Sequence, residues 1–120
     1  MDERKGGGYG PMITISKNLV IPEDQEENRK KLTAAITKRR ISSRTLQCII
    51  LPTTEDGVLE VIPAFALRLE AKSHPITVIG VCEGKKPALK LVEEMIGKVY
   101  NETGAFDVRS YYLGEETAEK

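Results

Sequence analysis

The chain has little of what catalysis and secretion usually require: its 120 residues include one histidine, two cysteines and no tryptophan. Cys48 and Cys82 lie in apolar runs without metal-ligand spacing, so we expect reduced thiols in a cytoplasmic protein, with a single disulfide left open. His74 has no cysteine or acid at the spacing of a triad or a metal site, which excludes the usual histidine-dependent hydrolase and favours an exposed turn residue. We therefore expect no metal and no cofactor.

Long apolar runs and aromatic residues are also scarce. No run approaches the roughly 20 residues of a bilayer-spanning helix, and the first residues (Met-Asp-Glu-Arg-Lys-Gly-Gly-Gly) form no apolar leader, so no membrane contact is expected. Only 5% of residues are aromatic while 40% are hydrophobic, which predicts an aliphatic core. The 18 basic and 18 acidic side chains cancel, whereas a dedicated nucleic-acid-binding domain is usually basic overall.

The hydrophobic pattern predicts one domain over 12–114, between a flexible Gly-rich tail at 1–11 and a flexible acidic tail at 115–120. The expected helices cover 23–40, 64–72 and 86–103. The expected strands cover 45–51, 58–62, 76–82 and 108–113, with a further short edge strand at 12–16. We expect 45–51 to be central, because both its faces are apolar, and 58–62 to be antiparallel to it. This order predicts an α/β fold, with α+β left open, in which two to three helices cover one mixed sheet of about four strands.

Two of the expected helices carry further predictions. Residues 64–72 alternate between apolar and other side chains as a strand does, yet they contain no β-branched residue and follow Pro63, so we favour a helix. Helix 86–103 begins near Pro87 and is expected to end at a Gly104 cap. Gly97 in its middle costs about 1 kcal/mol relative to alanine, which suggests close packing on the sheet.

The largest irregularity of charge is residues 29–44, which carry no acid. The basic side chains of this segment are Arg29, Lys30, Lys31, Lys38, Arg39, Arg40 and Arg44. A solvated helix with acids in its first turn and bases in its last is the simplest interpretation, because such ends match the helix dipole. Binding of an acidic partner comes next, and the contact residues we predict are Arg29, Lys30, Arg39, Arg40 and Arg44.

A second candidate site is the loop 82–87, which joins a strand to a helix. Ligands of open α/β sheets bind at such carboxyl ends. Cys82, near a helix N-terminus and two lysines, could have a lowered pKa and act as a nucleophile. Lys85 and Lys86 could bind an anion such as a phosphate. The match to a phosphate-binding loop is poor, because the first glycine and the hydroxyl after the lysine are missing.

A third candidate is the last expected strand. If 108–113 lies at a sheet edge, Tyr111 and Tyr112 point to opposite faces and one of them is exposed for contact. Such an edge also allows a homodimer to form by strand addition.

These features predict a small non-enzymatic binding or regulatory protein that contacts a protein partner, or a second copy, at the basic helix end. The first alternative is a nucleic-acid-binding accessory protein that uses the same segment. The second is a Cys82-dependent enzyme or phosphometabolite binder at loop 82–87, although a small-molecule ligand is the less expected kind of partner.

Overall fold

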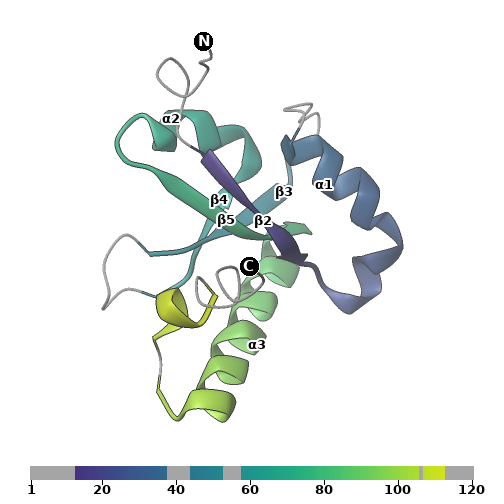
Figure 1. Ribbon diagram of the computed structural model, residues 1–120. Helices are drawn as coiled ribbons and strands as arrows, with labels where there is room; N and C mark the ends of the chain where they lie inside the picture. Colours follow the sequence, from purple (N-terminus) through teal and green to yellow (C-terminus); the bar gives the residue numbers. More distant parts are fainter. Residues whose placement is uncertain (1–12, 38–43, 53–57, 106, 113–120) are drawn as a thin grey trace.

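The computed structural model describes residues 13–37, 44–52, 58–105 and 107–112 (Figure 1). The helical elements are η1 (Glu23–Asn28), α1 (Arg29–Thr37), η2 (Ala64–Ala66), α2 (Leu67–Ala71), α3 (Lys85–Thr103) and a short helix at 108–112. The strands are β2 (Ile13–Val20), β3 (Leu46–Ile50), β4 (Glu60–Pro63) and β5 (Ile76–Glu83). They form one mixed sheet in the order β2-β5-β3-β4, which confirms the predicted fold class. The tails expected at 1–11 and 115–120 lie outside these residues.

The two central strands are those whose sequences are apolar on both faces. β3 runs antiparallel to both β5 and β4, and every residue of β3 is buried. β5 also pairs in parallel with β2, where Ile13 lies opposite Ile76. The edge strand expected at 12–16 is confirmed and continues to Val20, with irregular pairing after Ile15.

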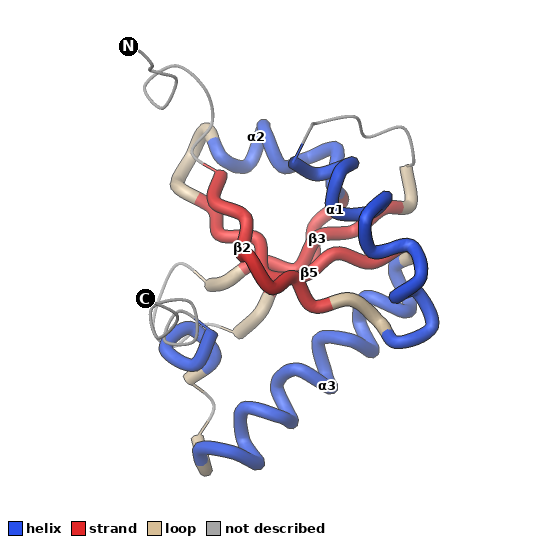
Figure 2. The backbone as a smooth tube through the Cα atoms, turned by 45° about the vertical axis from the view of Figure 1, so that its right-hand side comes forward, coloured by secondary structure: helices blue, strands red, loops and turns tan. Residues whose placement is uncertain are grey.

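Helices cover both faces of the sheet, so the core has two halves (Figure 2). On one face α1 and α2 pack against the sheet through side chains such as Leu32 and Leu67. On the other face α3 and helix 108–112 pack through Leu91, Met95 and Tyr112. Within the described residues no helix is both long and apolar enough to cross a membrane.

The helix predicted at 64–72 is confirmed as η2 followed by α2. Ala64, Leu67 and Ala71 are buried at helical spacing. Of the apolar residues that alternate in the sequence, Leu67 and Ala71 face the core, whereas Phe65 and Leu69 are exposed. The helix predicted at 23–40 begins with the 3₁₀ turns of η1 and continues as α1 to Thr37, and its last three positions lie outside the described residues.

Three glycines differ in their surroundings or in their backbone conformation. A Cβ on Gly80 would lie 3.1 Å from the Val20 carbonyl oxygen and 3.2 Å from Ile49 Cδ1, so this glycine allows β2 and β3 to approach β5. Gly97 has nothing within 4 Å of its Cβ position, so the close packing predicted for it is wrong. Gly104 ends α3 with φ 77°, as predicted.

The strand predicted at 108–113 is wrong, because residues 108–112 form a helix. The Asp107 carboxylate caps it by accepting a bond from the Ser110 N–H at 3.1 Å, and the Tyr111 N–H donates to the Asp107 carbonyl at 3.1 Å. Val108 and Tyr112, four residues apart, are both buried against the α3 side of the core. The six residues 108–113 contain only one such pair, which is too little to show a helical period in the sequence.

Candidate functional site

The carboxyl end of β5 is connected to α3 by a tight turn at Gly84. Gly84 has φ 97°, and a Cβ there would lie 3.1 Å from Pro87 Cδ, so a side chain at this position would be strained. Its N–H donates to the Thr45 carbonyl at 2.9 Å, and the Thr45 hydroxyl donates to the Glu83 carboxylate. Loop 82–87 is therefore a fixed connection tied to the start of β3.

The Gln25 side chain of η1 closes the edge of β5 beyond the last residue of β2. Its Nε2 donates to the Glu83 carbonyl at 3.0 Å, and its Oε1 accepts from the Glu83 N–H at 2.8 Å. Since β2 ends at Val20, opposite Gly80, the Gln25 amide takes the place of a further strand residue. Nothing in the sequence distinguished Gln25 from its acidic neighbours.

Cys82 lies beneath this contact and is 0% exposed. Burial raises the pKa of its thiol to about 11. The Gln25 amide, 3.7 Å from Sγ, lowers this pKa, while the nearby Asp24 and Glu83 charges raise it further. This direction is opposite to that of an activated nucleophile, whose thiolate must form near neutral pH.

Cys48 is also 0% exposed, and burial raises its pKa to about 12. Cys48 packs on the α1 and α2 face of the sheet, whereas Cys82 packs on the α3 face. Two thiols on opposite faces cannot form a disulfide without rearrangement of the strands. The disulfide left open by the sequence is therefore absent, and both cysteines are free.

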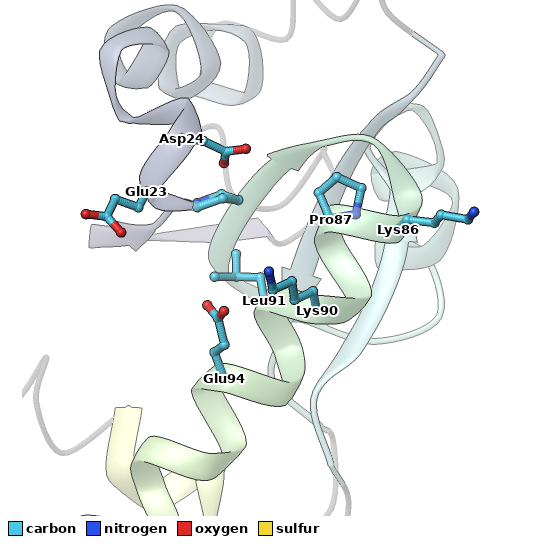
Figure 3. A pocket seen from close by; sticks show the side chains of 8 residues that line it. Glu23, Asp24, Lys86, Pro87, Lys90, Leu91 and Glu94 are labelled. Atoms are coloured by element: carbon cyan, nitrogen blue, oxygen red, sulfur yellow. The ribbon is translucent and has the colours of Figure 1, made fainter.

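A hollow of about 630 Å³ opens between η1 and the first turns of α3 (Figure 3). The carboxylates that line it are those of Glu23, Asp24 and Glu94, and the ammonium groups are those of Lys86 and Lys90. Figure 3 shows the Lys86 side chain running away from Glu23 and Asp24.

These features weigh against a phosphate site at this hollow. The acids outnumber the bases, so the local charge does not favour a phosphate. Pro87, the third residue of α3, lacks the N–H that a helix start would otherwise offer to an anion. Lys85 is exposed and does not line the hollow.

A second hollow of about 490 Å³ continues this groove along α3. The two hollows share Pro22, Glu23, Leu91 and Glu94, and the second extends to Tyr112. The shared floor is buried and apolar at Leu91, and the rims carry charges of both signs. In the part of the chain that the structure describes, no three or more histidine, cysteine or acidic residues gather as metal ligands.

The basic side chains of segment 29–44 differ in whether they bind other groups of the fold. Arg29 binds the Glu26 carboxylate through Nε at 2.8 Å and Nη2 at 2.7 Å, and donates from Nη1 to the Leu19 carbonyl at 2.9 Å. The hydrogen bond between Arg29 and Glu26 raises the pKa of the arginine and lowers that of the glutamate. Arg29 thus connects η1 to β2 and has few donors left for a partner.

The other cations of the segment face solvent where they are described. Lys30 and Lys31 on α1 and Arg44 before β3 are exposed. The predicted contact residues Arg39 and Arg40, with Lys38, lie outside the described residues.

His74 lies in the turn before β5, as expected. Its Nδ1 lies 3.0 Å from the Pro75 carbonyl, and its Nε2 lies 3.2 Å from the Glu70 carboxylate. The Pro75 bond is the larger cause, with Glu70 second, of a raised pKa. Both partners belong to the local turn, which matches a structural role.

Tyr111 and Tyr112 occupy one helix and not the two faces of an edge strand. The Tyr111 hydroxyl donates to Glu102 at 2.5 Å, and the Tyr112 hydroxyl donates to the Met95 carbonyl at 3.4 Å. Their rings pack edge to face with centroids 5.0 Å apart. Dimerisation by strand addition at 108–112 is excluded by this helix, while a role for either tyrosine at another interface stays a prediction.

Comparison of the chain with protein-family models, with curated proteins and with solved structures gave no match in any of the three.

Proposed function

We propose that this chain is a small non-enzymatic binding protein that contacts an acidic macromolecular partner through the basic segment 29–44. The observation that supports this proposal most directly is the exposure of Lys30, Lys31 and Arg44. None of the three forms an ion pair with an acid in the described part of the chain. Cations without an ion-pair partner among the described residues can contact another molecule, in contrast to Arg29.

A binding role also agrees with the chemistry of the described side chains. Both thiols are buried and hold their protons at neutral pH. The groove beside α3 presents charges of both signs, with no cysteine, serine, threonine or histidine among its lining residues. The Cys82-dependent reaction would need a thiolate near neutral pH, and the raised pKa of this buried thiol therefore favours a binding role over that alternative.

An acidic protein fits the segment better than a nucleic acid does. Lys30 and Lys31 point about 100° apart on α1, so they form no single row for a phosphate backbone. No aromatic residue lies between the cations to stack on bases. A second copy of the chain is itself a candidate partner, because Glu23, Asp24 and Glu27 of η1 are exposed acids.

The test compares two triple charge reversals that change the net charge equally. The first combines Lys30→Glu, Lys31→Glu and Arg44→Glu, and the control combines Lys86→Glu, Lys90→Glu and Lys98→Glu on exposed positions of α3. We expect wild type and control to bind poly-L-glutamate at low salt, and the first variant to bind at least ten times more weakly. Circular dichroism checks that all three proteins are folded.

Equal affinity of both variants for poly-L-glutamate would contradict the proposal. The nucleic-acid alternative predicts that single-stranded RNA or duplex DNA binds more tightly than poly-L-glutamate, with log affinity falling linearly against log salt concentration. Affinity capture from the native cells with the same three proteins then identifies the partner, which should be lost only with the first variant.

A further inference from the structure

The outer face of η2 and α2 exposes the two most accessible large apolar side chains of the described residues. Phe65 is 61% exposed and Leu69 is 70% exposed. They are four residues apart, so they lie on the same side of the helix. Exposed apolar side chains that adjoin one another are typical of contact sites, whereas single ones are common on any surface.

The opposite face of the same helix holds this pair in place. Ala64, Leu67 and Ala71 are buried in the core half that also contains α1. Strand β4 leads directly into the helix, and α2 lies at the outer end of the molecule near the start of β2 (Figure 1). The outward direction of Phe65 and Leu69 is therefore set by the core and does not depend on a loop.

Two cations share the exposed face. Arg68 and Lys72 are exposed, and together with Phe65 and Leu69 they span an arc of about 100° on a helical wheel. Neither cation forms an ion pair with an acid in the described part of the chain. The acid of this helix, Glu70, contacts His74. On the wheel the two cations lie on one side of this arc and the two apolar residues on the other.

We propose that the face formed by Phe65, Arg68, Leu69 and Lys72 is a docking surface for an acidic amphipathic helix of a partner protein. Two apolar residues at i and i+4 span about one turn, or roughly 6 Å along the axis, and match one repeat of the apolar stripe of a facing helix. Carboxylates beside that stripe would meet Arg68 and Lys72, whereas a basic helix would be repelled. This surface shares no residue with the segment 29–44, so it does not depend on the function proposed above.

The probe is a synthetic helical peptide of 15 residues with leucines at i and i+4 spacing and glutamates along one flank. A second peptide carries lysines in place of the glutamates. Each is titrated into the ¹⁵N-labelled full chain, and backbone amide shifts are followed by NMR. We expect the glutamate peptide to shift the amides of residues 64–73 and the lysine peptide to leave them unchanged.

Variants then distinguish peptide binding at this face from non-specific binding to exposed apolar side chains elsewhere. Phe65→Ser and Leu69→Ser should each weaken binding of the glutamate peptide about tenfold or more, since both side chains are already exposed and their loss leaves the core intact. Leu89→Ser on α3, where the side chain is 48% exposed, is the matched control and should bind as wild type does. Arg68→Glu combined with Lys72→Glu should reverse the preference toward the lysine peptide.

Several results would overturn this proposal. These are equal binding of the two peptides, shifts that map outside 64–73, or an equal loss in Leu89→Ser. Self-association of the wild type that disappears in Leu69→Ser would show that a second copy occupies the face in place of an acidic helix. The triple reversal at Lys30, Lys31 and Arg44 should leave peptide binding intact, so the two proposals can fail separately.

Discussion

The two buried thiols allow the non-enzymatic reading to be tested by a rate measurement. A pKa of about 11 makes the thiolate of Cys82 about one hundred times scarcer at neutral pH than in a thiol of pKa 9.0. The more basic thiolate regains about tenfold in nucleophilicity. Ionisation alone therefore predicts that Cys82 reacts with the disulfide reagent DTNB at least ten times more slowly than free cysteine, whose pKa is about 8.5, and its burial slows the reaction further.

The two cysteines differ in which part of the fold must move before DTNB can reach the thiol. Cys48 lies in the central strand β3, so its labelling requires opening of the sheet. Cys82 is covered partly by η1 through Gln25, so detachment of that single element exposes it. In Gln25→Ala the two bonds to Glu83 are lost, at a cost of about 1–3 kcal/mol, so labelling of Cys82 should accelerate by about 5- to 150-fold.

The assay follows DTNB absorbance at neutral pH and locates each adduct by peptide mass mapping. Glu27→Ala, an exposed position of the same element, is the control and should leave both rates unchanged. A Cys82 in the folded wild type that reacts as fast as free cysteine would refute this reasoning and revive the Cys82-dependent enzyme. Equal acceleration of Cys48 in Gln25→Ala would show that Gln25 stabilises the whole fold and not this edge alone.

The remaining predictions concern stability in urea, followed by circular dichroism. Gly80→Ala should lower the free energy of unfolding by roughly 1–2 kcal/mol, because its Cβ would crowd Val20 and Ile49. Gly97→Ala should raise it by about 0.5–1 kcal/mol, because the position is open and helical; changes of the same sign at both glycines would contradict the packing described here. Arg29→Ala should lower stability by about 1 kcal/mol, mainly through the lost bond to the Leu19 carbonyl, while the exposed Lys31→Ala stays within about 0.5 kcal/mol of wild type. The pKa of His74 is raised in the folded protein, so its contribution to the free energy of unfolding should be complete below about pH 6.5 and disappear as the pH rises through that raised pKa. A His74→Gln variant whose free energy of unfolding has the same pH dependence as wild type between pH 6 and pH 8 would refute this.

Much of the architecture could be predicted because it depends on local pattern. The apolar runs at 46–50 and 76–82 leave no polar face for solvent, so only central positions satisfy them. The wide apolar stripe of α3 and its Gly104 cap are likewise local properties. For 64–72, residue preferences for helix outweighed an alternation that resembled a strand.

The candidate sites were less predictable, because they depend on contacts between distant segments. Gln25 and Glu83 are 58 positions apart, and only the packing of η1 on the end of β5 gives this glutamine its role. The same packing buries Cys82 and reverses the direction expected for its pKa. Arg29 belongs to the basic segment by sequence, yet it binds Glu26 and the Leu19 carbonyl within the fold.

By itself the sequence determined the mixed sheet, its two central strands and the helices η1–α1, η2–α2 and α3, because each follows from apolar spacing or residue preference within one segment. Only the tertiary structure decided that 108–112 is a helix, that the two thiols face opposite sides, and that Phe65 and Leu69 remain exposed. These outcomes depend on which surfaces of other segments are left to cover each side chain. That information belongs to the assembled fold and to no single stretch of the chain.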